Sequence, residues 1–226
     1  MLRRKLSVFL PVVIGLVSVA MPVAADQYSL TLDHCTGTCG TSPFGTIDVA
    51  QDGANTVKLT VTLSSADKFV STGFPGSLGF DLVGNPTISV SNATAGWSLV
   101  SSTAGNLRFD GFGNFDYAFT CDVCGNGSSN PFAGPISFDI TAVGLTPASF
   151  QELSRIPPGT ESAYFVADII GSNGNSGPVG ATLSSTAAPE PSTCLLFGAG
   201  IALFGAWRSR RSRLLMAEQT ISRNAS

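Results

Sequence analysis

Four cysteines are the residues best suited to chemistry in the central part of the chain. They occur as two closely spaced pairs, Cys35-x3-Cys39 and Cys121-x2-Cys124. Pairs of this spacing are typical either of a four-thiolate zinc site or of disulfide bonds. A redox-active pair is a third interpretation of the second motif, but such motifs begin a helix, whereas Gly125-Asn126-Gly127 follows here. The choice between zinc and disulfides depends on the compartment in which the chain folds.

Histidine-dependent catalysis has little basis in this sequence. His34 is the single histidine, and nucleophile activation or zinc hydrolysis generally needs at least one well-placed imidazole. Carboxylates remain available for glycoside hydrolysis or, together with asparagines, for Ca²⁺ binding. These candidates are Asp110, Asp116, Asp122, Asp139, Asn114 and Asn126. Their spacing matches neither the ordered calcium loop nor a recognisable catalytic pair, so we predict a non-enzyme with no catalytic residue, no metal site and no cofactor.

The segment that must position these residues has the pattern of an all-β domain. Apolar and polar residues alternate at 28–33, 44–50 and 56–63, which indicates half-buried strands. Further strands are predicted at 78–83, 87–91, 97–100, 106–110, 116–120, 136–142, 164–170 and 179–183. A short helical turn is predicted at 148–153. Short strands at this spacing predict a β-sandwich, jelly-roll-like, over residues 26–183.

Aromatic residues are frequent in the middle of this segment. They are Trp97, Phe109, Phe112, Phe115, Tyr117 and Phe119. Such a group can form a platform on which sugars stack, but in a sandwich aromatic residues more often fill the core. We therefore expect them to be buried.

The N-terminal residues 1–25 have the layout of a secretory signal peptide. Arg3, Arg4 and Lys5 precede an apolar run over residues 6–20. Small residues follow at Val23 and Ala25, the positions that a signal peptidase reads. An uncleaved anchor is the alternative, but these small residues favour cleavage after Ala25.

The C-terminal part contains a second apolar run, at 193–207. As a helix it spans about 22 Å, short of the roughly 30 Å of hydrocarbon in a bilayer, so a core helix is the alternative. Trp207 and the arginines that follow it favour a transmembrane helix, because interfacial aromatic and basic residues flank such helices. The arginines, expected to stop the helix in the membrane, are Arg208, Arg210, Arg211 and Arg213. Both basic clusters are expected to be cytoplasmic, with 214–226 as a cytoplasmic tail.

The tripeptide Pro189-Glu190-Pro191 precedes this helix. Tripeptide, apolar helix and arginine cluster in this order, at residues 189–213, resemble the PEP-CTERM sorting signal. The resemblance implies recognition by an exosortase, a membrane cysteine protease of Gram-negative bacteria that is often encoded beside exopolysaccharide genes. Two prolines resist helix and strand pairing, so they keep the tripeptide extended for a protease. Residues 184–188 are expected to be a linker, and the tail after Arg213 is longer than the family usually has.

The net charge of residues 26–188 and the compartment in which they fold narrow the choice of partners and of cysteine chemistry. Residues 26–188 contain four Lys and Arg but thirteen Asp and Glu, and this acidic surface argues against nucleic acid as a partner. Export places the four outer cysteines in an oxidising compartment, which favours disulfides over zinc. Because each pair lies in its own Gly-rich loop, we expect bridges within the pairs, Cys35 to Cys39 and Cys121 to Cys124.

The expected function is that of an exported, exosortase-processed structural or adhesion protein of the cell surface or extracellular matrix. Its expected partners are the exosortase, the membrane and exopolysaccharide. The alternative is a secreted carbohydrate-binding module or glycan-active enzyme with the same sorting tail.

Overall fold

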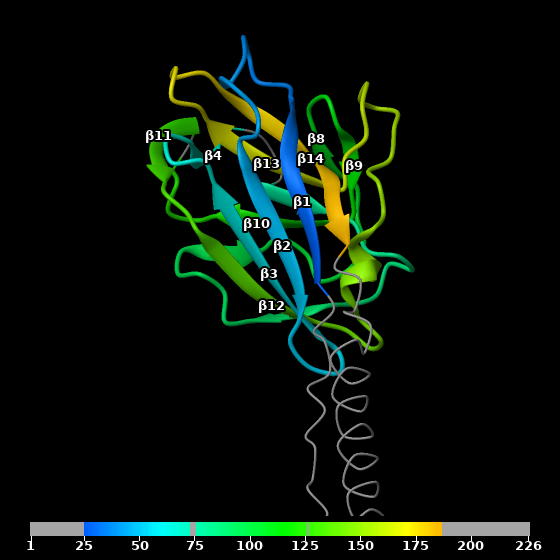
Figure 1. Cartoon of the computed structure of the whole chain (residues 1–226). Helices are drawn as coiled ribbons and strands as arrows, with labels where there is room; N and C mark the ends of the chain where they lie inside the picture. Colours follow the sequence, from blue (N-terminus) through cyan, green and yellow to red (C-terminus); the bar gives the residue numbers. More distant parts are fainter. Residues whose placement is uncertain (1–24, 73–75, 126, 187–226) are drawn as a thin grey trace, which may run out of the picture.

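A computed structural model describes residues 25–72, 76–125 and 127–186 of the chain. These residues form fourteen strands and one 3-10 helix (Figure 1). The elements are β1 (Ala25–Asp33), β2 (Gly45–Gln51), β3 (Thr56–Leu63), β4 (Lys68–Ser71), β5 (Leu78–Phe80), β6 (Ser89–Ser91), β7 (Trp97–Leu99), β8 (Leu107–Phe109), β9 (Gly113–Phe115), β10 (Tyr117–Cys121), β11 (Gly127–Phe132), β12 (Ile136–Thr141), η1 (Pro147–Phe150), β13 (Phe165–Ile170) and β14 (Ser176–Thr186).

Strand β3 illustrates why these segments adopt extended structure. Its sequence TVKLTVTL is rich in β-branched residues, which favour strands. Val57, Leu59 and Val61 are fully buried, while Lys58 on the opposite face is exposed. The period-two pattern of the sequence therefore corresponds to a sheet with one face against the core.

Twelve strands form one antiparallel sheet, and ten of them follow the order β6-β12-β3-β2-β1-β14-β13-β5-β10-β7. β4 pairs with β13 and β11, and β8 and β9 form a separate hairpin. The two ends of the order, β6 and β7, are consecutive in the chain, and Thr94 between them exchanges hydrogen bonds with Ser137 of β12. The sheet is thus nearly closed. The all-β class is confirmed, but one curved sheet takes the place of the two separate sheets of the expected jelly-roll-like sandwich.

Aromatic side chains from opposite parts of this sheet meet in the core. The rings of Phe119 in β10 and Phe138 in β12 stack with centroids 3.7 Å apart. Phe80 of β5 stacks on Phe119, with centroids 5.6 Å apart. Trp97 and Phe109 are 5% exposed, and the other four of the six predicted core aromatics are fully buried. The prediction that these residues fill the core is confirmed.

Three strands had no prediction from the sequence: β4, β9 and β11. β11 has the sequence GSSNPF, which lacks apolar alternation and contains a proline, and proline in a strand argues against the assignment. The helical turn occurs as η1, slightly before the predicted position. Pro147 begins it, and a proline is well tolerated at a helix start.

The first and last strands of the described residues, β1 and β14, are neighbours in the sheet, so residues 25 and 186 lie at the same end of it. Asp26 in β1 is paired with Thr186 in β14, and Figure 1 shows the two strands side by side. β14 extends through Thr186, so residues 184–186 of the expected linker are in the sheet. Within the described residues no helix has the length and apolarity needed to cross a membrane. The predicted signal peptide up to residue 24, Pro189-Glu190-Pro191, the helix at 193–207, its arginines and the tail 214–226 lie outside the described residues.

Candidate functional site

The paired ends of β1 and β14 form the first candidate site. The register runs Tyr28 with Leu183, Gln27 with Ser185 and Asp26 with Thr186, so a β-bulge lies between the first two pairs. Two residue pairs, Gln27 with Ser185 and Asp26 with Thr186, lie between the bulge and the end of β14. A bulge inserts an extra residue and locally interrupts the ladder of hydrogen bonds.

Hydroxyl groups tie this part of β14 to β1. The Ser184 hydroxyl donates a hydrogen bond to the Ser29 hydroxyl over 2.6 Å. The hydroxyls of Thr31 and Thr182 are 3.1 Å apart. Both contacts are exposed to solvent, and exposed polar contacts of this kind contribute little net stability because water can replace them.

The two strands that flank β14 pair with different lengths of it. β13 pairs with β14 as far as Ala181, whereas β1 pairs with it through Thr186. Among the described residues, β1 is the only strand paired with β14 beyond Ala181. β1 itself is supported on its other side by β2, from Leu30 to Ala25. The terminal five residues of β14, Thr182–Thr186, are therefore a one-sided strand end.

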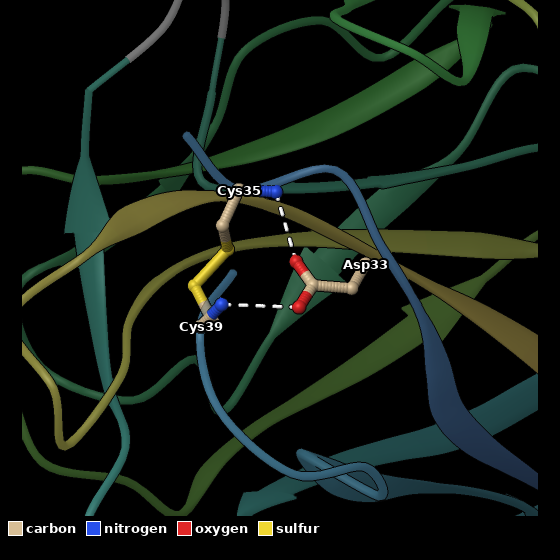
Figure 2. A group of neighbouring side chains, drawn as sticks. All are labelled: Asp33, Cys35 and Cys39. Atoms are coloured by element: carbon tan, nitrogen blue, oxygen red, sulfur yellow. Dashed lines mark hydrogen bonds between the residues drawn. A yellow bond between two sulfur atoms is a disulfide. The ribbon is translucent and has the colours of Figure 1, made fainter. Parts of the chain in front are cut away.

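The second candidate site is the loop closed by Cys35 and Cys39. The sulfur atoms of these residues are bonded, as are those of Cys121 and Cys124. Both local disulfides predicted from the sequence are confirmed. The Asp33 carboxylate accepts hydrogen bonds from the backbone N–H groups of Cys35 and Cys39, over 2.9 and 3.0 Å, as Figure 2 shows.

Metal binding at this loop would need free thiolates. Side-chain ligand atoms of Asp33, Cys35 and Cys39 lie within 4.8 Å of one another. Metals are bound by the thiolate form of cysteine, and both sulfurs are used in the disulfide. Asp33 therefore serves here to order the loop that carries the disulfide.

The carboxylates that could support glycoside hydrolysis have separate partners. Asp139 accepts a hydrogen bond from Asn92, and Asp122 accepts one from Ser98. Asp110 lies 3.6 Å from Arg108, with both side chains largely exposed. Asp116 is 3% exposed and is bound through both oxygens by Arg155. Each of these four carboxylates thus has its own local partner.

Asp81 is a buried acid to which no sequence motif pointed. Its side chain is fully buried, and its Oδ1 accepts a hydrogen bond from the backbone N–H of Asp116 over 2.5 Å. Among the described residues, its Oδ2 has no hydrogen-bond partner. Burial raises the pKa of Asp81 to about 7, and the nearby negative charge of Asp116 adds to this, while the N–H of Asp116 and the charge of Arg155 oppose it.

An open cavity of about 580 Å³ lies at the end of the sheet where β1 finishes and β14 starts. Its lining includes His34, Arg108, Asp110, Asp168 and Ser176. These side chains supply hydrogen-bond donors and acceptors of both charges. The cavity is at the opposite end of β1 and β14 from the pair Asp26 and Thr186.

Comparison with known families explains the chain beyond β14. Residues 187–211 match the family model described as the PEP-CTERM protein-sorting motif. The chain carries a PEP-CTERM sorting motif. Pro189-Glu190-Pro191 and the arginines at 208, 210 and 211 fall inside the match, which ends before Arg213. No curated protein and no solved structure matches the chain.

The PEP-CTERM motif directly follows the last strand of the fold. The match begins at residue 187, and β14 ends at Thr186. The motif is that of an exported protein sorted through the membrane, and it implies processing by exosortase, a membrane enzyme. The folded domain thus continues into the sorting motif without an intervening spacer.

Proposed function

We propose that this protein is a PEP-CTERM surface or extracellular-matrix protein, with a structural or adhesive role and no enzymatic activity. The observation that carries the proposal is the continuity of β14 with the sorting motif. A tether attached at Thr186 would leave the loops at the other end of β1 and β14 directed away from the membrane. The acidic composition of residues 26–188 would favour solubility outside the cell.

The proposed route has three steps. The signal peptide directs export and is removed after Ala25, so that Asp26 becomes the first residue. The helix 193–207 and its arginines then hold the chain in the inner membrane with the C-terminus in the cytoplasm. Exosortase processes the chain at the motif, and the β domain passes to the cell surface or matrix of a Gram-negative bacterium, where exopolysaccharide is its proposed neighbour.

The test is replacement of Pro189-Glu190-Pro191 by three alanines in a host that has an exosortase. We expect the variant to remain full-length in the membrane fraction, while the wild type is shortened and leaves it. Replacement of Ser101-Ser102-Thr103 in an exposed loop by three alanines is the matched control, and it should be processed normally. Unchanged processing of the first variant would refute the proposal. Intact mass of the processed chain also tests whether it begins at Asp26.

A second candidate function is glycan binding. The polar cavity at the end of the sheet favours it, because mixed donors and acceptors suit the hydroxyl groups of a sugar. The test is incubation of the processed protein with a panel of polysaccharides. Saturable binding that Arg108→Ala weakens would support a binding module, and turnover of a polysaccharide would support an enzyme.

A further inference from the structure

The sorting motif directly follows a strand end that has a neighbour on one side only. β13 stops at Ala181, and Thr182–Thr186 are held by β1 alone. We propose that this strand end has two alternative partners: β1 in the folded domain, and the substrate cleft of the enzyme that processes the motif. This proposal rests on the proposed function, because it assumes an exosortase that acts on the motif.

The short connection between β14 and the tripeptide favours release of the strand end during processing. Pro189 is three residues beyond Thr186, so the folded sheet can be no more than about 10 Å from the tripeptide when β14 is fully paired. Release of the strand end leaves seven residues between Ala181 and Pro189, so the Cα atoms of Ala181 and Pro189 can lie up to about 27 Å apart. The released chain gives a membrane enzyme room to take hold of the tripeptide without a collision with the domain.

The strand end also has the shape that such an enzyme would bind. Extended peptides are recognised by the addition of a strand to a sheet edge, through backbone hydrogen bonds. Residues 182–186 are already extended, so transfer from β1 to an enzyme exchanges one set of backbone hydrogen bonds for another.

Local features favour opening at this position rather than farther along β14. The bulge between Tyr28 and Gln27 interrupts the ladder, and the hydroxyl contacts of Thr182 and Ser184 are exposed. A second register shift with β1 lies between Leu30 and Leu32, opposite Ala181 and Gly180. There β14 is also paired with β13, so opening can stop at Ala181. β1 stays in place, since β2 pairs with it over the same stretch.

The decisive experiment locks the strand end to β1. Gln27 and Ser185 are directly paired, and opposite residues of antiparallel strands lie within the Cα separation that a disulfide spans. The double variant Gln27→Cys and Ser185→Cys, oxidised, should be processed at least tenfold more slowly than wild type. Processing at the wild-type rate would overturn the proposal.

The control lock joins β2 to β3 through Asp48→Cys and Thr60→Cys, which are also directly paired. Both double variants lose the hydrogen bond from Gln27 to Asp48, so this loss cancels in the comparison. The control should be processed at the wild-type rate, and equal slowing of both locks would contradict the proposal. Thermal unfolding and mass spectrometry confirm that each lock is folded and correctly bridged.

A spacer tests the same idea without added cysteines. Eight Gly and Ser residues inserted between Thr186 and Ala187 should speed processing of the otherwise unchanged chain and restore processing of the Gln27–Ser185 lock. The same insertion in the exposed turn between Gly53 and Ala54 should do neither. A locked chain that stays unprocessed despite the spacer would refute the proposal. Failure of the proposed function itself is distinct, because then the wild type and the triple-alanine variant of the motif would behave alike.

Discussion

Arg155 binds both carboxylate oxygens of Asp116, with Nη1 2.6 Å from Oδ2 and Nη2 2.7 Å from Oδ1. Asp116 precedes β10, and Arg155 belongs to the segment between η1 and β13. The backbones of Arg155 and Asn114 also exchange hydrogen bonds. The ion pair thus joins the connection between η1 and β13 to the start of β10, and the backbone hydrogen bonds join it to the β8–β9 hairpin.

Removal of the arginine should therefore destabilise the domain. Arg155→Ala leaves the buried carboxylate of Asp116 without its counter-charge, and we expect a loss of about 3 kcal/mol in the free energy of unfolding. Arg108→Ala is the matched control, because the Arg108–Asp110 pair is exposed, and the expected change is below about 0.5 kcal/mol. Denaturant unfolding of both variants measures the difference. Equal effects would contradict the structural role assigned to Arg155.

Asp81 should give the domain a particular pH dependence. The pKa of its carboxyl rises from 3.8 to about 7 on folding. Well below pH 3.8 the group is neutral in both states and does not oppose folding. Between pH 4 and 7 the unfolded chain ionises while the folded chain stays neutral, so stability falls by about 1.4 kcal/mol for each unit by which the pKa differs.

The variant Asp81→Asn tests this dependence. Its amide cannot ionise, so the fall in stability between pH 4 and 7 should be smaller than in the wild type, and the variant should gain relative to it as pH rises. The charged groups that act on Asp81, namely Asp116, Arg155 and Glu152, are present in both proteins. Thermal unfolding at a series of pH values gives the comparison. Parallel curves for the two proteins would show that Asp81 titrates normally.

Asp33 should control how firmly the first disulfide loop is held. Asp33→Ala removes the acceptor of two backbone N–H groups, and we expect a loss of about 2 kcal/mol in the free energy of unfolding and faster reduction of Cys35–Cys39 by dithiothreitol. Asp33→Asn keeps one acceptor oxygen and should show an intermediate effect. The rate of reduction of Cys121–Cys124 in the same samples is an internal control. Identical behaviour of wild type and Asp33→Ala would show that the carboxylate is not needed.

Gly171 should not tolerate a side chain. A Cβ atom at this position would lie 1.8 Å from the backbone oxygen of Cys39, which cannot move aside as a flexible side chain would. Gly171→Ala should cost about 2 kcal/mol or more in the free energy of unfolding. At Gly105 the nearest atom would be 3.8 Å away, so Gly105→Ala should change stability by less than about 0.5 kcal/mol. Urea denaturation of the two variants separates these outcomes, and a stable Gly171→Ala protein would show that the disulfide loop is less closely packed.

Among the strands that were predicted from the sequence, β3 has the clearest local signal. In β3 the alternation of Val57, Leu59 and Val61 with polar residues is a local signal, and the structure confirms it. β11 had no such signal, because none of its six residues is buried and three are exposed. Both disulfides could be predicted because a bridge between cysteines only three or four residues apart does not depend on the rest of the fold.

Contacts between residues far apart in the chain could not be predicted from the sequence. The pairing of Asp26 with Thr186 joins opposite ends of the domain, and the closure of the sheet depends on which distant strands meet. Asp81 lies in the sequence GFDLVG, where nothing distinguishes a buried acid from one at a strand end in solvent. Its role depends on Asp116, 35 residues away along the chain.

The direction of β14 within the sheet determines how the domain bears tension. Up to Ala181 this strand lies between β1 and β13, antiparallel to both. A force between its C-terminal end and the loop after β1 acts along the strand, so the backbone hydrogen bonds on both of its sides are loaded in shear and must yield together. The domain should therefore withstand a lengthwise pull far better than a sideways one, which would break the bonds of the strand end one after another.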